Sequence, residues 1–233
     1  SQSFIKKLKK KAEEKLIEKA FDEKEGEKQN ASGQQTAHPS MANTRGSGLV
    51  TTPPDVEANI DGAGKAYQEK AFSKTRHAIR QALLGVEMEI GQNILKGLPE
   101  TVQDLKYDQA GDKVTSTGIG FVGLTVERVY LSSDQEMTVT IGNDATMLSA
   151  VNMYLTAGAY EQSTEEQDYK QVDHQGYRGI LEYDEASGYT LSVPFGQSSI
   201  IIIDGINFED EEEMMKAAGF IDIENIKKEL EEK

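Results

Sequence analysis

The chain has 233 residues, no cysteine and a formal net charge of −15. The charge excludes general attraction to nucleic acid, and the missing cysteines exclude disulfides, thiolate metal sites and cysteine nucleophiles. No apolar run approaches the ~18 residues of a membrane span, and a hydrophobic content of 37% places part of the chain outside any core.

Residues 1–25 are predicted to form an isolated amphipathic docking helix. Their apolar side chains recur at helical spacing in one stripe, and the partner-binding residues inferred from it are Phe4, Ile5, Leu8, Leu16, Ile17 and Phe21. A lone helix of this length is marginal in water, so the stripe needs a surface to pack against. That surface is the chain's own domain, another protein or, through weak contact, an anionic membrane.

Residues 26–63 are rich in Gly, Ser, Gln and Pro and show no apolar period. This composition predicts a flexible linker between the docking helix and a third part, residues 64–233.

The third part begins with a predicted helix over residues 66–96. Its apolar residues step by three or four positions and form the stripe Ile79, Leu83, Val86, Ile90 and Ile94. Gly85 and Gly91 lie inside it, so we expect a bend or two separate pieces. The sequence "GLP" at residues 97–99 ends the helix.

Beyond residue 99 the apolar period changes from helical to alternating. Two strands are predicted around a turn at residues 132–134, then a helix after Asn143 or Asp144, three strands between residues 176 and 204, and two helices over 209–218 and 222–230. The short turns predict an α+β domain with a mostly antiparallel sheet of about five strands packed with helices. The run Ile200 to Ile203 predicts a central strand covered on both faces.

Gly118, Gly120 and Gly123 match the G-x-G-x-x-G pattern of dinucleotide-binding loops. That chemistry needs a helix to start at the last glycine and point at the phosphate. Here "LTVERVYLS" follows, which has the composition of a strand. We therefore predict a glycine-rich strand entrance, with a bulge near Glu127–Arg128, and no nucleotide site.

Titratable residues give no assembled site in the sequence. His38, His77 and His174 lack metal-ligand spacing and are predicted to lie at the surface. Neither the repeat Asp104, Asp108 and Asp112 nor the acidic run 209–213 follows the order of a calcium-binding loop. We predict no catalytic residue, no cofactor and no metal ligand.

Several stretches together are similar to a group of Gram-negative, Bacteroidota-like cell-envelope proteins. They are "LPETV", "GLTVERVY", "MTVTIGNDATMLSAVNMYL", "GYRGILEYDE" and the C-terminal "IIIIDGINFEDEEEMMKAAGFIDIENIKK". Asp144, Met147 and Leu148 match that group's central helix, and Ile221, Asp222 and Ile223 match its terminal helix. The start "SQSFIKKLKKKAEEKLIEKAF" resembles the mature start of many secreted Bacteroidota proteins. The resemblance implies an exported, non-catalytic protein, such as an accessory or plug subunit of an outer-membrane protein-export channel.

The expected function is that of a non-enzymatic protein-binding or scaffolding module of an envelope complex. We expect a periplasmic or extracellular location after removal of a signal peptide, because the sequence does not begin with Met. One alternative is a protein that binds a small apolar or lipid ligand between sheet and helices, and another is an uncharacterised enzyme.

Overall fold

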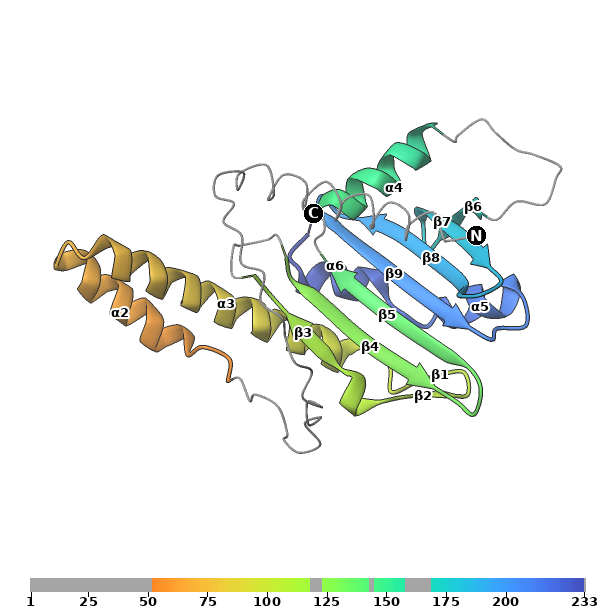
Figure 1. Cartoon of the computed structure of the whole chain (residues 1–233), viewed down its shortest axis with the longest axis horizontal. Coiled ribbons are helices and arrows are strands. Elements are labelled where there is room, and N and C mark those ends of the chain that lie inside the picture. The colour runs from red at the N-terminus through yellow and green to blue at the C-terminus, as the bar shows by residue number, and fades with distance from the viewer. Residues whose placement is uncertain (1–51, 118–122, 143–144, 158–168, 233) are drawn as a thin grey trace, which may run out of the picture.

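The computed structural model describes residues 52–117, 123–142, 145–157 and 169–232. Its centre is one antiparallel sheet of nine strands, in the order β1-β2-β4-β5-β9-β8-β7-β6 with β3 also pairing β4 (Figure 1). This confirms the α+β class, but the expected number of about five strands is too low. The strands are β1 Thr101–Val102, β2 Leu105–Tyr107, β3 Lys113–Thr115, β4 Thr125–Leu131, β5 Glu136–Gly142, β6 Tyr169–His174, β7 Tyr177–Asp184, β8 Gly188–Phe195 and β9 Ser199–Ile206.

The five strands that alternation predicts are β4, β5, β7, β8 and β9. The other four escaped prediction for physical reasons. β1, β2 and β3 have only two or three residues each, too few to show a period. β6 is an edge strand with a single apolar aliphatic residue, Val172, so it carries no apolar alternation.

The central strand β9 divides the core into two layers. Ile201 and Ile203 face the main core, while Ile200 faces a smaller cluster under helix α4 (Ala145–Ala157) with Val151 and Leu155. The prediction that this run is central and covered on both sides is therefore confirmed.

Helices α5 (Glu211–Ala218) and α6 (Ile223–Glu229) lie on the other face of the sheet from α4 (Figure 1). Each starts one or two residues after its predicted start and has a carboxylate at its N-cap. The Asp210 side chain accepts a hydrogen bond from the N–H of Glu213 at 2.9 Å, and Asp222 accepts one from Asn225 at 3.0 Å. These caps satisfy backbone donors that a helix leaves unpaired.

Two long-range contacts hold the C-terminal helices against the sheet. Gln175, in the turn between β6 and β7, donates to the carbonyl of Ile221 at 2.7 Å and accepts from the N–H of Ile223 at 3.2 Å. The Glu232 carboxylate accepts from the backbone N–H groups of Gln197 and Ser198 at 2.8 and 3.2 Å. The end of the described chain is thus fixed to the β8–β9 turn.

Helices α2 (Val56–Gln68) and α3 (Phe72–Gly97) form an antiparallel hairpin that projects from the side of the sheet (Figure 1). Residues 56–63, which the sequence assigns to the linker, are therefore helical. The helix predicted over residues 66–96 is divided at the turn 69–71 and not at its glycines, because α3 runs unbroken through both of them. Small side chains at the contact allow this packing: Ala63, Ala66 and Ala82 are buried, and Gly85 lies against Pro54 and Val56.

The second glycine of α3, Gly91, is where the hairpin meets the sheet. A side chain on Gly91 would overlap the methyl groups of Val114 in β3. Valine is stiff about χ1, so it cannot turn aside easily. The absence of a side chain at residue 91 therefore sets how closely α3 approaches the sheet.

We expect Gly91→Ala to lower the free energy of unfolding by about 1–3 kcal/mol, because overpacking outweighs the higher helix propensity of alanine. The matched control is Gly62→Ala in α2, where a new methyl group meets nothing within 4 Å. That change should stabilise the protein by up to about 1 kcal/mol. Urea denaturation measures both changes, and equal stabilisation by both would contradict close packing at residue 91.

Candidate functional site

The predicted partner-binding residues of the N-terminal segment, Phe4 to Phe21, lie outside the described residues. So do His38, Gly118 and Gly120. The docking role of the first 25 residues therefore stays a prediction.

The glycine-rich motif leads into a strand, as the sequence predicts. Gly123 has a backbone φ of +106° and precedes β4, with no helix opening at it. The predicted bulge near Glu127–Arg128 is wrong, because β4 pairs with β5 without interruption from Thr125 to Leu131. The sequence suggested a bulge because Leu124 and Val126 alternate onto one face of the strand, whereas Val129 and Leu131 alternate onto the other. Without the bulge, Arg128 takes a position on the core face.

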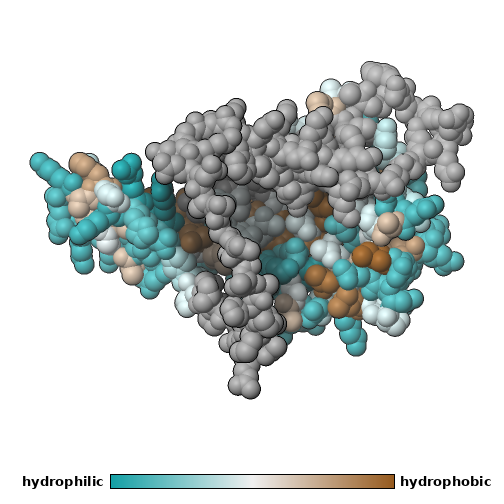
Figure 2. Space-filling model, viewed as in Figure 1, coloured by the Kyte–Doolittle hydropathy of each residue, from teal (hydrophilic) through white to brown (hydrophobic). Residues whose placement is uncertain are grey.

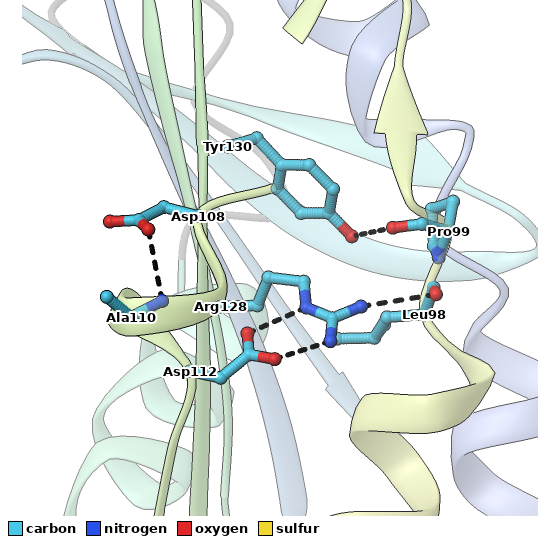
Figure 3. A network of polar contacts seen from close by, with 7 residues as sticks. All are labelled: Leu98, Pro99, Asp108, Ala110, Asp112, Arg128 and Tyr130. Atoms are coloured by element: carbon cyan, nitrogen blue, oxygen red, sulfur yellow. Dashed lines mark hydrogen bonds and ion pairs between the residues drawn. The ribbon is translucent and has the colours of Figure 1, made fainter. Parts of the chain in front are cut away.

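Arg128 is in fact buried at that core position and forms a polar network with Asp112 and Leu98 (Figure 3). Its guanidinium donates to both carboxylate oxygens of Asp112, at 2.8 and 2.6 Å, and to the carbonyl oxygen of Leu98 at 3.2 Å. The plane of the guanidinium also lies over the ring of Tyr107, 4.5 Å from its centroid. Four segments of the chain thus meet at one side chain.

The electrostatics of this network favour the ionised pair. Burial lowers the pKa of Arg128, but the hydrogen bond and negative charge of Asp112 outweigh that effect and raise it. Neighbouring Tyr130 donates its hydroxyl to the carbonyl of Pro99 at 2.9 Å, and burial raises its pKa to about 12. Arg128 and Tyr130 thus satisfy the carbonyl groups of Leu98 and Pro99, directly after the end of α3.

An open cleft of about 300 Å³ lies beside the network. Its wall is mainly polar, with Leu95 and Leu98 as its aliphatic members, and consists of Gln92, Leu95, Lys96, Leu98, Glu100, Tyr107, Gln109, Asp112 and Arg128. This lining does not fit an apolar or lipid ligand, because such ligands need predominantly hydrophobic walls. Arg128 and Asp112 point toward each other, and Arg128 also binds the carbonyl of Leu98, so the buried pair acts as a clamp between the end of α3 and the sheet.

The repeated aspartates have separate structural roles. Asp108 caps the short 3₁₀ helix Gln109–Gly111 by accepting from the N–H of Ala110 at 3.0 Å, and Asp112 pairs with Arg128. Within the described ranges, no three His, Asp or Glu side chains come close enough together to hold a metal ion. The same ranges contain no helix both long and apolar enough to cross a bilayer.

His174 is buried, which corrects the prediction of a surface residue, whereas His77 is exposed on α3. His174 is the last residue of β6. Its Nε2 atom has no hydrogen-bond partner among the described residues. Burial lowers the pKa of His174, although a hydrogen bond with the backbone of Ala218 and the charge of Asp173 act in the opposite direction.

Five of the eleven large hydrophobic side chains that are exposed in the described part of the chain lie on the hairpin. The predicted stripe of α3 is buried at Ile94, partly buried at Ile90 and exposed toward the hairpin tip. Hydrophobic residues interrupt the hydrophilic surface of the hairpin at the left of Figure 2. The residues that we call the hairpin face are Ile60, Tyr67, Phe72, Ile79 and Val86, exposed by 58, 65, 55, 53 and 39%.

Helix geometry places these residues on one side of the hairpin. Successive side chains are rotated by about 100° around the helix axis. On this basis Ile60 in α2 and Ile79 in α3 each lie about 80–90° around their own helix from the side that contacts the other helix. Both are rotated in the same direction when each helix is viewed from its N-terminus. Because α2 and α3 run antiparallel, equal rotations bring both rows to the same face. The rings of Tyr67 and Phe72 confirm this, since their centroids lie 6.0 Å apart across the tip.

Comparisons with known proteins leave the family open. No protein-family model matches the chain, and no solved structure matches it significantly. A stretch of 88 residues is 31% identical to a protein of Methanocaldococcus vulcanius named proteasome subunit beta. The likeness covers 37% of this chain and 40% of that protein, so the chain spans well under half of its relative.

We expect Arg128→Met to lower the free energy of unfolding by about 3 kcal/mol, because it leaves the Asp112 carboxylate without its buried partner. The double variant Arg128→Met/Asp112→Leu should lose less than the sum of the two single changes, since no unpaired charge remains. The control is Lys113→Ala, which breaks the exposed Lys113–Glu127 ion pair and should have a much smaller effect. Additive losses in urea denaturation would contradict the clamp.

We expect the buried His174 to make the protein less stable as the pH falls. Its pKa is lowered in the folded state, so below the unfolded value of 6.5 the unfolded chain binds a proton that the folded chain does not. The free energy of unfolding should therefore decrease between pH 7.5 and pH 5.5. His174→Gln should flatten this dependence in urea denaturation, and an unchanged slope would show that other groups cause it.

Proposed function

We propose that this chain is a non-enzymatic protein-binding module and that the hairpin face is its docking surface. The observation that carries this proposal is that one helical stripe is core at Ile94 and solvent-exposed at Ile79. Exposed apolar patches of this kind on a projecting element are typical of protein-interaction sites.

The energetics of the hairpin face support docking. Full burial of a large aliphatic side chain contributes about 1.5–3 kcal/mol, so covering a half-exposed one contributes about 1 kcal/mol. Five such residues together favour association by several kcal/mol before the entropic cost of binding. The hairpin is also held in advance by the contacts of Gly85 and Gly91, which reduces the ordering cost on binding.

Two finer parts of the proposal rest on the sequence. The stripe Phe4, Ile5, Leu8, Leu16, Ile17 and Phe21 supports a second docking element in the first 25 residues, and the resemblance to exported proteins supports a place in the cell envelope. Deletion of residues 1–25 is the change that separates this second element from the hairpin face.

The likeness to a proteasome subunit favours a second candidate function, which is that of a subunit in a larger protein particle. A protein so named is a subunit of a larger particle, which agrees with a role in protein assembly. If such a subunit is an enzyme, the activity to test is peptide-bond cleavage. Turnover of fluorogenic peptides by the purified chain would favour it over a non-enzymatic module.

A photo-crosslinking amino acid at residue 79 is expected to capture a protein in the native cells, because this position lies at the middle of the hairpin face. The matched control carries the same amino acid at Lys74, which is exposed on the opposite side of α3. Mass spectrometry identifies the adducts. Equal capture from both positions, or none from residue 79, would contradict docking at this face.

A further inference from the structure

We propose that a second copy of this chain covers the hairpin face, so that two hairpins pack face to face as a four-helix bundle. This inference rests on the proposed function, since it names the partner of the same surface. The observation behind it is that the two edges of the hairpin face carry opposite charges.

The acidic edge belongs to α2 and the basic edge to α3. At about 100° per residue, Glu57 and Asp61 lie on the outer side of α2, next to Ile60. By the same geometry Arg76 and Arg80 lie on the outer side of α3, next to Ile79. All four side chains are exposed, and none forms an ion pair within the described part of the chain.

Two-fold symmetry allows two ways of stacking one hairpin face on another. A two-fold axis across the hairpins would place α2 over α2 and α3 over α3, with like charges together. An axis along the hairpins places α2 of each copy over α3 of the other. The acidic edge of each copy then runs beside the basic edge of its partner, so the charges select the second arrangement.

The charged residues also meet at the same height along the bundle. Asp61 lies about nine residues before Lys70, at the turn of the hairpin, and Arg80 lies about ten residues after it. With a rise of about 1.5 Å per residue, both are about 14–15 Å from the turn. Asp61 of one copy therefore lies level with Arg80 of the second copy, and the symmetry repeats this pair.

The same charges argue against the N-terminal segment of the chain as the occupant. That segment carries five lysines between Lys6 and Lys11, which match the acidic edge of the hairpin face but offer no negative charge to Arg76 and Arg80. A second copy has one edge of each sign, as the hairpin face requires. The apolar stripe and both charged edges are then matched by one partner.

The test uses the full chain at about 1–100 µM in analytical ultracentrifugation. We expect a dimer, and we expect Ile79→Glu to produce a monomer while the control Lys74→Glu stays dimeric. Two further variants reverse one edge each: Glu57→Lys/Asp61→Lys has two basic edges, and Arg76→Glu/Arg80→Glu has two acidic ones. Each alone should dimerise about tenfold more weakly or worse, because like charges face each other.

An equal mixture of the two edge variants is the decisive sample. It should form a heterodimer of wild-type affinity, since basic edges then face acidic edges on both sides of the bundle. A monomeric wild-type chain, a dimer that survives Ile79→Glu, or a mixture that does not associate would overturn the proposal. If Leu8→Glu/Leu16→Glu converts a monomeric chain into a dimer, the N-terminal segment is the occupant instead.

The crosslinking experiment separates this inference from the proposed function. Adducts between two copies at residue 79 support both. Adducts with a different protein alone leave the docking function in place and overturn self-association.

Discussion

The buried pair of Arg128 and Asp112 lies where the sheet meets the segment that follows α3. Arg128 stands in β4, its carboxylate partner just before β3, and the carbonyl that it also binds just after α3. A charged group in the core is costly unless it is paired and hydrogen-bonded, so this position tolerates only one arrangement of the three segments. The clamp thereby fixes the direction in which α3 leaves the sheet.

The hairpin depends on that direction. α3 approaches the sheet closely at Gly91 and is approached by α2 at Gly85, so both contacts rely on residues without side chains. Beyond residue 90 its apolar stripe belongs to the core, and before that residue the same stripe faces solvent. One continuous helix therefore runs from the core of the domain to the hairpin face. Because its C-terminal part is packed in the core, the position of the exposed part is fixed as well.

Periodicity in the sequence predicted the elements whose two faces differ. The strands β4, β5, β7, β8 and β9 and the helices α4, α5 and α6 alternate or cycle between apolar and polar residues over at least seven positions. The very short strands and the edge strand β6 have no such contrast. The site was harder to predict, because the Arg128–Asp112 pair depends on tertiary contact and the apolar pattern of the sequence indicated a bulge near Glu127–Arg128 instead. The apolar stripe through Ile79 could be predicted from its helical spacing. Which half of the stripe is buried could not, because that depends on where α3 extends beyond the sheet.

The net charge of −15 is a general obstacle to self-association, yet it acts weakly at the hairpin. In physiological salt the Debye length is about 8 Å, so charges on the distant acidic helices are screened from this surface. The charges close to the hairpin face therefore determine whether two copies repel each other. There, the acidic residues Glu57 and Asp61 are matched in number by Arg76 and Arg80. A chain that is strongly acidic as a whole thus carries, on the hairpin of α2 and α3, an apolar face whose two edges have opposite charges.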